Sequence, residues 1–162
     1  MNHLEKLMSQ YYDWQGYIVK TNVHVGKRKA GGYEGELDVV AYHPENKHLI
    51  HIECSTDAHN WEMREQRFKK KFETGRKHII PALFPWLTGS GIKLEQMALL
   101  ALSSVKHSSL AGGKVISVDA MIAIITQKIK QYGKMSSHAI PENYDLLRTI
   151  QLVVCGYMGV VK

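Results

Sequence analysis

Length, composition and charge already exclude several classes of protein. The chain has 162 residues, 44% of them hydrophobic, which suits a single domain over residues 1–162 and is too short to divide comfortably into two. Two cysteines without C-x-x-C spacing exclude a disulfide framework and a structural zinc site, so Cys54 and Cys155 are expected as buried thiols. The amino terminus lacks the apolar core of a signal peptide, and no run reaches membrane-spanning length; we expect a cytoplasmic protein without a membrane partner.

The first predicted element is a helix over residues 2–13, with Asn2 as its cap. Its apolar face recurs at helical spacing and consists of Leu4, Leu7, Met8 and Tyr11. Glu5 lies beside that face. An acid in the first turn also suits the helix dipole, so its position alone does not predict a function.

A glycine-rich basic turn follows between predicted strands at 17–25 and 36–42. It carries Lys27, Arg28 and Lys29. Such a turn could follow a phosphate backbone, and a plain hairpin loop would look much the same. Both interpretations stay open.

Residues 35–55 read GELDVVAYHPENKHLIHIECS, two strand-like runs joined by a turn at 43–47. The period of two places Leu37, Val39 and Ala41 on the apolar side of the first run. Asp38 lies on the other side, and Glu53 lies on the mixed side of the second run together with His51, for which we expect packing or hydrogen bonding. Antiparallel pairing would bring both carboxylates to one face, where they repel unless a cation lies between them. The hairpin therefore indicates a magnesium site, although an Asp and a Glu also meet by chance on solvent-facing strands.

The order of a leading helix, a strand, GELDVVAY, a short turn and LIHIECS resembles the PD-(D/E)XK phosphodiesterase superfamily. This is the restriction-endonuclease-like fold of restriction enzymes, Holliday-junction resolvases and small DNA-repair nucleases. The resemblance implies that Asp38 and Glu53 bind Mg²⁺ or Mn²⁺, with the backbone carbonyl of Cys54 as a further ligand. It also implies a role for Glu5, because resolvase-like members carry a first-helix glutamate in the metal shell. Ser55 stands where the motif lysine is expected, and a serine hydroxyl cannot supply its positive charge.

The segment 58–74 predicts a helix capped by Asp57, with Trp61, Phe68 and Phe72 on its apolar face. Beside that face lie the candidates to replace the missing lysine, namely Gln66, Lys69 and Lys70. A solvated helix face with ordinary ion pairs would show the same pattern. The wider basic cluster, which includes Arg64, Arg67 and Lys71, predicts a phosphate-binding surface.

The second half predicts strands at 97–102 and 114–118, a helix from about 119 to 132, and a final helix opened by Pro141. Trp86, in an apolar segment interrupted by prolines, is expected in the core. The final helix either closes the core or makes a dimer contact, so a homodimer stays open.

The assembled order predicts an α/β protein with the restriction-endonuclease-like three-layer α/β/α fold and a mixed central sheet. The resemblance implies a magnesium-dependent deoxyribonuclease that hydrolyses DNA phosphodiester bonds. The charge of +6 and pI near 9.3 favour a polyanionic partner such as DNA. Ser55 supports the alternative of a catalytically inactive DNA-binding or assembly module of the same fold. A protein-interaction domain with an incidental basic surface is a third interpretation.

Overall fold

The computed structural model of the protein describes residues 2–102 and 107–158. Within these ranges six strands form one mixed sheet in the order β1-β2-β3-β4-β6-β5. The strands are β1 Ile18–Lys27, β2 Tyr33–His43, β3 His48–Ser55, β4 Leu94–Leu100, β5 Ser109–Leu110 and β6 Gly113–Ser117. The helices are α1 His3–Trp14, α2 Trp61–His78, α3 Val118–Tyr132 and α4 Asp145–Cys155, with short helical turns at Ile79–Leu83 and Pro85–Leu87.

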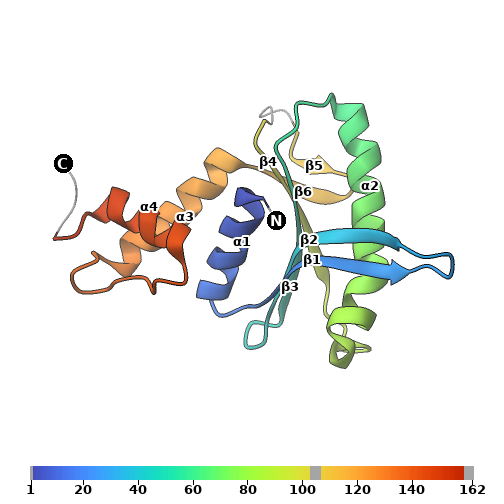
Figure 1. Cartoon of the computed structure of the whole chain (residues 1–162), viewed down its shortest axis with the longest axis horizontal. Coiled ribbons are helices and arrows are strands. Elements are labelled where there is room, and N and C mark those ends of the chain that lie inside the picture. Colours follow the sequence, from blue (N-terminus) through green and yellow to red (C-terminus); the bar gives the residue numbers. More distant parts are fainter. Residues whose placement is uncertain (1, 103–106, 159–162) are drawn as a thin grey trace.

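The helices lie on opposite sides of the sheet. Figure 1 shows α1, α3 and α4 on one side and α2 on the other. The predicted three-layer α/β/α arrangement with a mixed central sheet is therefore confirmed. Among the residues that the structure describes, no helix combines the length and apolar content needed to span a bilayer.

Each face of the sheet carries its own hydrophobic core. On the side of α1, α3 and α4 the buried side chains include Met8, Val39, Ile52, Leu99, Ile125 and Leu147. On the α2 side two smaller clusters form, one around Leu49, Ile79 and Phe84 and one around Phe68, Phe72 and Leu100. Strand β3 lies between these cores, so every one of its residues after His48 is buried. The two thiols, Cys54 and Cys155, are free and buried, as expected.

The first three strands form the predicted antiparallel meander. The β2–β3 turn closes at Lys47, whose φ of 49° is left-handed. Strands β1 and β2 run further than predicted, to Lys27 and from Tyr33, so that they project past α2 as a two-stranded ribbon (Figure 1). The connection from β3 through α2 then makes β4 parallel to β3, as a crossover through a helix requires.

Two predicted helix starts are wrong: α2 is capped by a residue closer to its first turn, and the start of α4 is bound by a residue distant in sequence. Helix α2 is capped by Asn60, whose Oδ1 accepts from the Met63 N–H at 2.9 Å, and not by Asp57. Helix α4 begins at Asp145 and not at Pro141, because residues 141–144 form a turn. The Leu146 N–H at its first turn donates to Gln10 Oε1 of α1 at 3.0 Å. A side chain distant in sequence thus satisfies this helix end.

Trp86 is 62% exposed, so its predicted place in the core is wrong. The neighbouring Phe84 is fully buried and fills that space, and Trp86 meets its ring edge-on with the centroids 5.5 Å apart. The prolines of this segment favour short turns, which allow adjacent aromatic side chains to point in different directions.

Replacement of Phe72 by alanine tests the core beneath α2. Phe72 is fully buried against the sheet, so Phe72→Ala is expected to lower the free energy of unfolding by about 3–5 kcal/mol. The control Trp86→Ala removes an exposed aromatic and should cost at most about 1.5 kcal/mol. Urea denaturation of both variants measures the difference, and equal losses would contradict this assignment of the core.

Candidate functional site

Asp38 of β2 and Glu53 of β3 lie side by side at the point where the two strands stop pairing. The last backbone pair of the ladder is Val39 with Ile52. Beyond it, the Cys54 N–H donates to Asp38 Oδ2 at 2.9 Å, and the Asp38 N–H donates to Glu53 Oε1 at 3.5 Å. The predicted convergence of the two acids on one face of the sheet is confirmed, and that face is the one covered by α2.

One element of the predicted strand parity is wrong. Leu37 does not join Val39 on the α1 side but packs with Val25 in a cluster on the α2 side. The pairing of β1 with β2 keeps its register across this point. The change of face occurs where Asn22, opposite Asp38, adopts a left-handed φ of 50°. Asp38 therefore sits at a bend of the ribbon.

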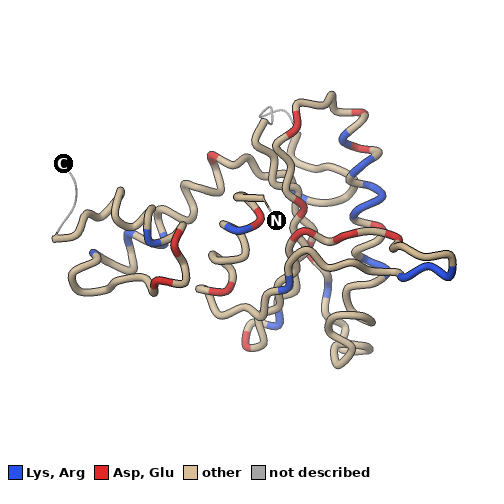
Figure 2. The backbone as a smooth tube through the Cα atoms, in the orientation of Figure 1, with Lys and Arg blue, Asp and Glu red and all other residues tan. Residues whose placement is uncertain are grey.

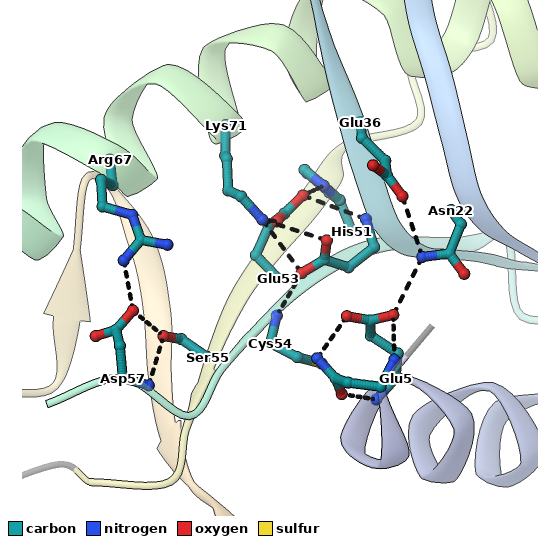
Figure 3. A network of polar contacts seen from close by, with 12 residues as sticks. Glu5, Asn22, Glu36, His51, Glu53, Cys54, Ser55, Asp57, Arg67 and Lys71 are labelled. Carbon is teal, nitrogen blue, oxygen red and sulfur yellow. Dashed lines mark hydrogen bonds and ion pairs between the residues drawn. The ribbon is translucent and has the colours of Figure 1, made fainter.

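The cation beside the two acids is Lys71 of α2 (Figure 3). Its Nζ lies 3.2 Å from both Asp38 Oδ1 and Asp38 Oδ2, and it donates to Glu53 Oε2. The side chain of Glu53 is fully buried and that of Asp38 is 11% exposed, while Lys71 is 33% exposed towards the surface. Three charged groups from three elements thus form one compact cluster.

The predicted replacements for the motif lysine are not the residues at this position. Gln66, Lys69 and Lys70 were expected there, whereas Lys71 was expected only on the phosphate-binding surface. Residues advance by about 100° around a helix, so Lys69 lies about 200° from Lys71. Gln66 and Lys69 are exposed, and Lys70 lines a cavity next to the acids.

The sequence showed only part of the buried side of α2, namely Phe68 and Phe72. The buried side of α2 includes Arg64 and Gly75 as well as the two phenylalanines. Gly75 is buried against β3, because a Cβ there would lie 2.4 Å from His51 Nδ1. Lys71 precedes Gly75 by four residues and follows Phe68 by three, so it lies on the same face of the helix as these two buried residues.

Burial and the neighbouring charges shift the pKa values of all three groups in the cluster. Burial and the charge of Glu53 raise the pKa of Asp38 to about 7, although Lys71 acts against this. Burial alone would raise the pKa of Glu53, but the hydrogen bond from His51 and the charge of Lys71 outweigh it and lower that pKa. Glu53 and Asp38 outweigh the burial of Lys71 and raise its pKa, so its ammonium stays charged at neutral pH.

Ser55 faces away from the acids. Its hydroxyl donates to Asp57 Oδ2 at 2.5 Å, and Arg67 Nη1 donates to the same oxygen at 2.5 Å (Figure 3). Arg64, predicted on the DNA-binding surface, is buried and donates to the carbonyls of Asp57 and Leu102 at 2.7 and 2.6 Å. Its guanidinium therefore anchors the segment after β3 and does not belong to an exposed surface.

Glu5 lies near Cys54, but its hydrogen bonds within the described part of the chain go to asparagines and not to the cluster of Asp38, Glu53 and Lys71 (Figure 3). Its carboxylate accepts from the Asn2 N–H at 2.9 Å, which completes the capping box of α1, and also from Asn22 Nδ2 of β1 at 3.1 Å. Across residues 2–102 and 107–158, no group of three or more His, Cys, Asp or Glu side chains lies close enough together to hold a metal ion. The structure thus does not bring Glu5 into one ligand group with Asp38 and Glu53.

A cavity of about 330 Å³ opens between the β1–β2 ribbon and α2. Its lining residues are Glu34, Gly35, Glu36, Asp38, Arg67, Lys70, Lys71 and Thr74. Glu34 ties the ribbon to the end of α2 through Lys77 Nζ at 2.7 Å and His78 Nε2 at 2.8 Å, and these bonds lower its pKa to about 2. Asp38 and Lys71 therefore lie in the wall of a cavity whose rim is held together by ion pairs.

The remaining predicted cations lie at the tip of the ribbon. Lys27, Arg28 and Lys29 are exposed, and Figure 2 shows this basic tip projecting past the basic residues of α2. The turn bends through Gly31 and Gly32, which have φ values of 93° and 75°. The loop is thus both basic and accessible.

Comparison with known proteins adds a limited likeness. No protein-family model matches the sequence, and no curated protein matches it. Among solved structures, the chain is similar to the small subunit of the heterodimeric restriction endonuclease R.BspD6I, with 15% sequence identity and a TM-score of 0.47. The alignment covers 98% of this chain and 82% of that subunit. At this level of similarity no function carries over, so function must be argued from the geometry of the site.

The raised pKa of Asp38 makes a prediction about stability. Between its ordinary pKa of 3.8 and about 7, the folded chain keeps a proton on Asp38 that the unfolded chain has released. This stabilisation is present at low pH and is lost as pH rises through about 7. Asp38→Asn keeps an acceptor for the Cys54 N–H, so its free energy of unfolding should exceed that of the wild type at about pH 8, and the gain should vanish by about pH 4. Urea denaturation at both pH values checks this, and a gain independent of pH would contradict it.

Proposed function

We propose that the chain is a metal-dependent deoxyribonuclease that hydrolyses DNA phosphodiester bonds at Asp38, Glu53 and Lys71. The observation that carries this proposal is the convergence of two buried carboxylates, from adjacent strands, on one cationic group in the wall of a cavity. Two carboxylates at such close range are costly to bury unless a cation lies beside them. Carboxyl groups with shifted pKa values in a cavity are typical of active sites.

The two carboxylates offer oxygen ligands to a divalent cation, with no third His, Cys, Asp or Glu grouped with them among the described residues. Asp38 Oδ1, Asp38 Oδ2 and Glu53 Oε2 already surround an ammonium ion, and hard divalent cations prefer such oxygen ligands. The N–H of Cys54 points to Asp38, and the C=O of a strand residue points to the same side as its N–H, which supports the Cys54 carbonyl as a further ligand. Mg²⁺ or Mn²⁺ held there would supply positive charge to the scissile phosphate and acidify a water molecule.

Lys71 replaces the lysine that the motif lacks at Ser55. Its pKa is raised, so it carries a full positive charge, and its partial exposure lets it reach a phosphate in the cavity. Stabilising the charge that develops on the phosphate is the task of such a group. Because Lys71 Nζ lies between the same oxygens, an incoming divalent ion competes with it for them.

The accessible cations supply the DNA contacts. Lys70 and Lys71 line the cavity on α2, while Lys27, Arg28 and Lys29 extend the basic surface along the ribbon. Lysine and arginine side chains on two projecting elements can contact phosphates on either side of the scissile bond. Arg67 is already paired with Asp57, which reduces its share of this surface.

A non-catalytic DNA-binding module is the second candidate, and one observation favours it. Lys71 already neutralises both carboxylates, as a cation would, while Ser55 is bound to Asp57. In that case the cluster would be purely structural. Calorimetric titration with Mn²⁺ separates the two functions: no Mn²⁺ binding together with salt-sensitive DNA affinity would favour the module.

The choice of lysine gives a sharp test of catalysis. Lys71→Met should lower the rate of Mg²⁺- or Mn²⁺-dependent DNA cleavage by about 100-fold or more, because the phosphate loses its cationic partner. The matched control Lys69→Met removes an exposed lysine on the same helix and should keep the rate within about threefold. Cleavage of plasmid, branched and single-stranded DNA measures both. Equal rates in the two variants would contradict the role of Lys71.

The ribbon tip makes a separate prediction about affinity. Replacing Lys27, Arg28 and Lys29 by glutamine should weaken DNA binding uniformly across sequences. It should also lower the slope of log affinity against log salt by about 0.9 for each DNA phosphate that the variant no longer neutralises. Fluorescence anisotropy over a salt series gives this slope. An unchanged slope would show that the ribbon does not contact DNA.

A further inference from the structure

A chain of hydrogen bonds runs behind Glu53, on the side away from the cavity. Arg76 Nη1 of α2 donates to Gln96 Oε1 of β4 at 2.5 Å. Gln96 Nε2 in turn lies 2.9 Å from the Phe72 carbonyl and 3.1 Å from His51 Nδ1. His51 Nε2 lies 2.7 Å from Glu53 Oε1. The chain thus connects an exposed arginine to a fully buried carboxylate.

Arg76 determines which atom donates in each of these hydrogen bonds. An arginine only donates, so the Gln96 atom facing Arg76 is the carbonyl oxygen, and the amide nitrogen faces the Phe72 carbonyl. That nitrogen also donates to His51 Nδ1, which must then act as an acceptor. The proton of the imidazole is therefore on Nε2, where it is donated to Glu53 Oε1.

The packing around His51 leaves it little freedom to adopt another arrangement. His51 is fully buried, and the ring of Phe72 meets it edge-on with centroids 5.7 Å apart. Gly75 closes the remaining side: a Cβ at this position would lie 2.4 Å from His51 Nδ1 and 3.1 Å from Gln96 Nε2. A glycine in the interior of α2 costs helix stability, and here it lets the helix lie close to His51 and Gln96.

We propose that Arg76, Gln96 and His51 are positioning residues that fix Glu53 so that Oε1 is held from behind and Oε2 faces the cation. The role in metal binding rests on the proposed function. The two oxygens of Glu53 already have separate partners, since Oε1 accepts from His51 and the Asp38 N–H while Oε2 accepts from Lys71. A carboxylate held in this way presents one oxygen to a metal ion in a single orientation, and partners of this kind govern metal affinity.

Mn²⁺ titration calorimetry on the full chain tests the positioning. His51→Leu removes the donor to Oε1 and should weaken Mn²⁺ binding by about 10- to 100-fold. His51→Gln can still donate from an amide nitrogen and should stay within about threefold of the wild type. The matched control is Gln151→Leu in α4, a fully buried glutamine that bonds Ile140, Gly133 and His138 far from the site in the chain. It should lower the melting temperature without weakening Mn²⁺ binding.

Nitrogen-15 NMR of the histidine rings tests the same proposal without metal. In the wild type near neutral pH, the His51 signal should show a proton on Nε2 and none on Nδ1. Gln96→Glu replaces the donor that faces Nδ1 by an acceptor of the same shape, so Nδ1 should then carry a proton. Melting curves confirm that each variant is folded.

These outcomes separate this proposal from the proposed function. If the wild type binds no Mn²⁺ and cleaves no DNA, the proposed nuclease function is rejected. The NMR result alone then tests the hydrogen bonds from Gln96 through His51 to Glu53. A proton on Nδ1 in the wild type overturns the chain. So does Mn²⁺ binding in His51→Leu that equals the wild type, or His51→Gln binding that is as weak as in His51→Leu.

Discussion

Two carboxylates buried at neighbouring strand positions are the constraint on which the rest of this structure depends. Asp38 and Glu53 repel each other, and burial makes their charges more costly. Lys71 supplies the compensating charge, so α2 must lie with that residue towards the sheet. Gly75 permits the close approach of the helix. The phase of α2 thus satisfies this electrostatic requirement together with the burial of Phe68 and Phe72.

The hydrogen bonds around the acids come from two directions, both on the α2 side of the sheet. From behind, His51 holds Glu53 through a chain that reaches Arg76. From the cavity side, only Lys71 contacts both acids among the described residues, and its side chain is partly exposed. Oε1 of Glu53 is therefore held by a buried partner, while Oε2 faces a partly exposed lysine, which is the arrangement that the proposed metal site needs.

The sequence was enough to predict the meander, the order of layers and the meeting of Asp38 with Glu53, because strand periodicity and a short turn determine them. It was not enough to find Lys71. Helix phase depends on which side meets the sheet, and that side carries Arg64 and Gly75, which do not read as apolar. Leu37 was misplaced for a related reason, since the left-handed Asn22 reverses the faces of the ribbon. Side chains that serve partners distant in sequence, such as Gln10 at the start of α4, also remain hidden from local patterns.

The most direct test of the central claim is a crystal structure of the chain soaked in Mn²⁺, with anomalous scattering used to locate the ion. The account predicts a peak about 2.1 Å from oxygens of both Asp38 and Glu53, with Oε1 of Glu53 still bonded to His51 and Lys71 Nζ moved out of its place between the carboxylates. A peak elsewhere, or no peak with Lys71 unmoved, would contradict a metal site at these two acids.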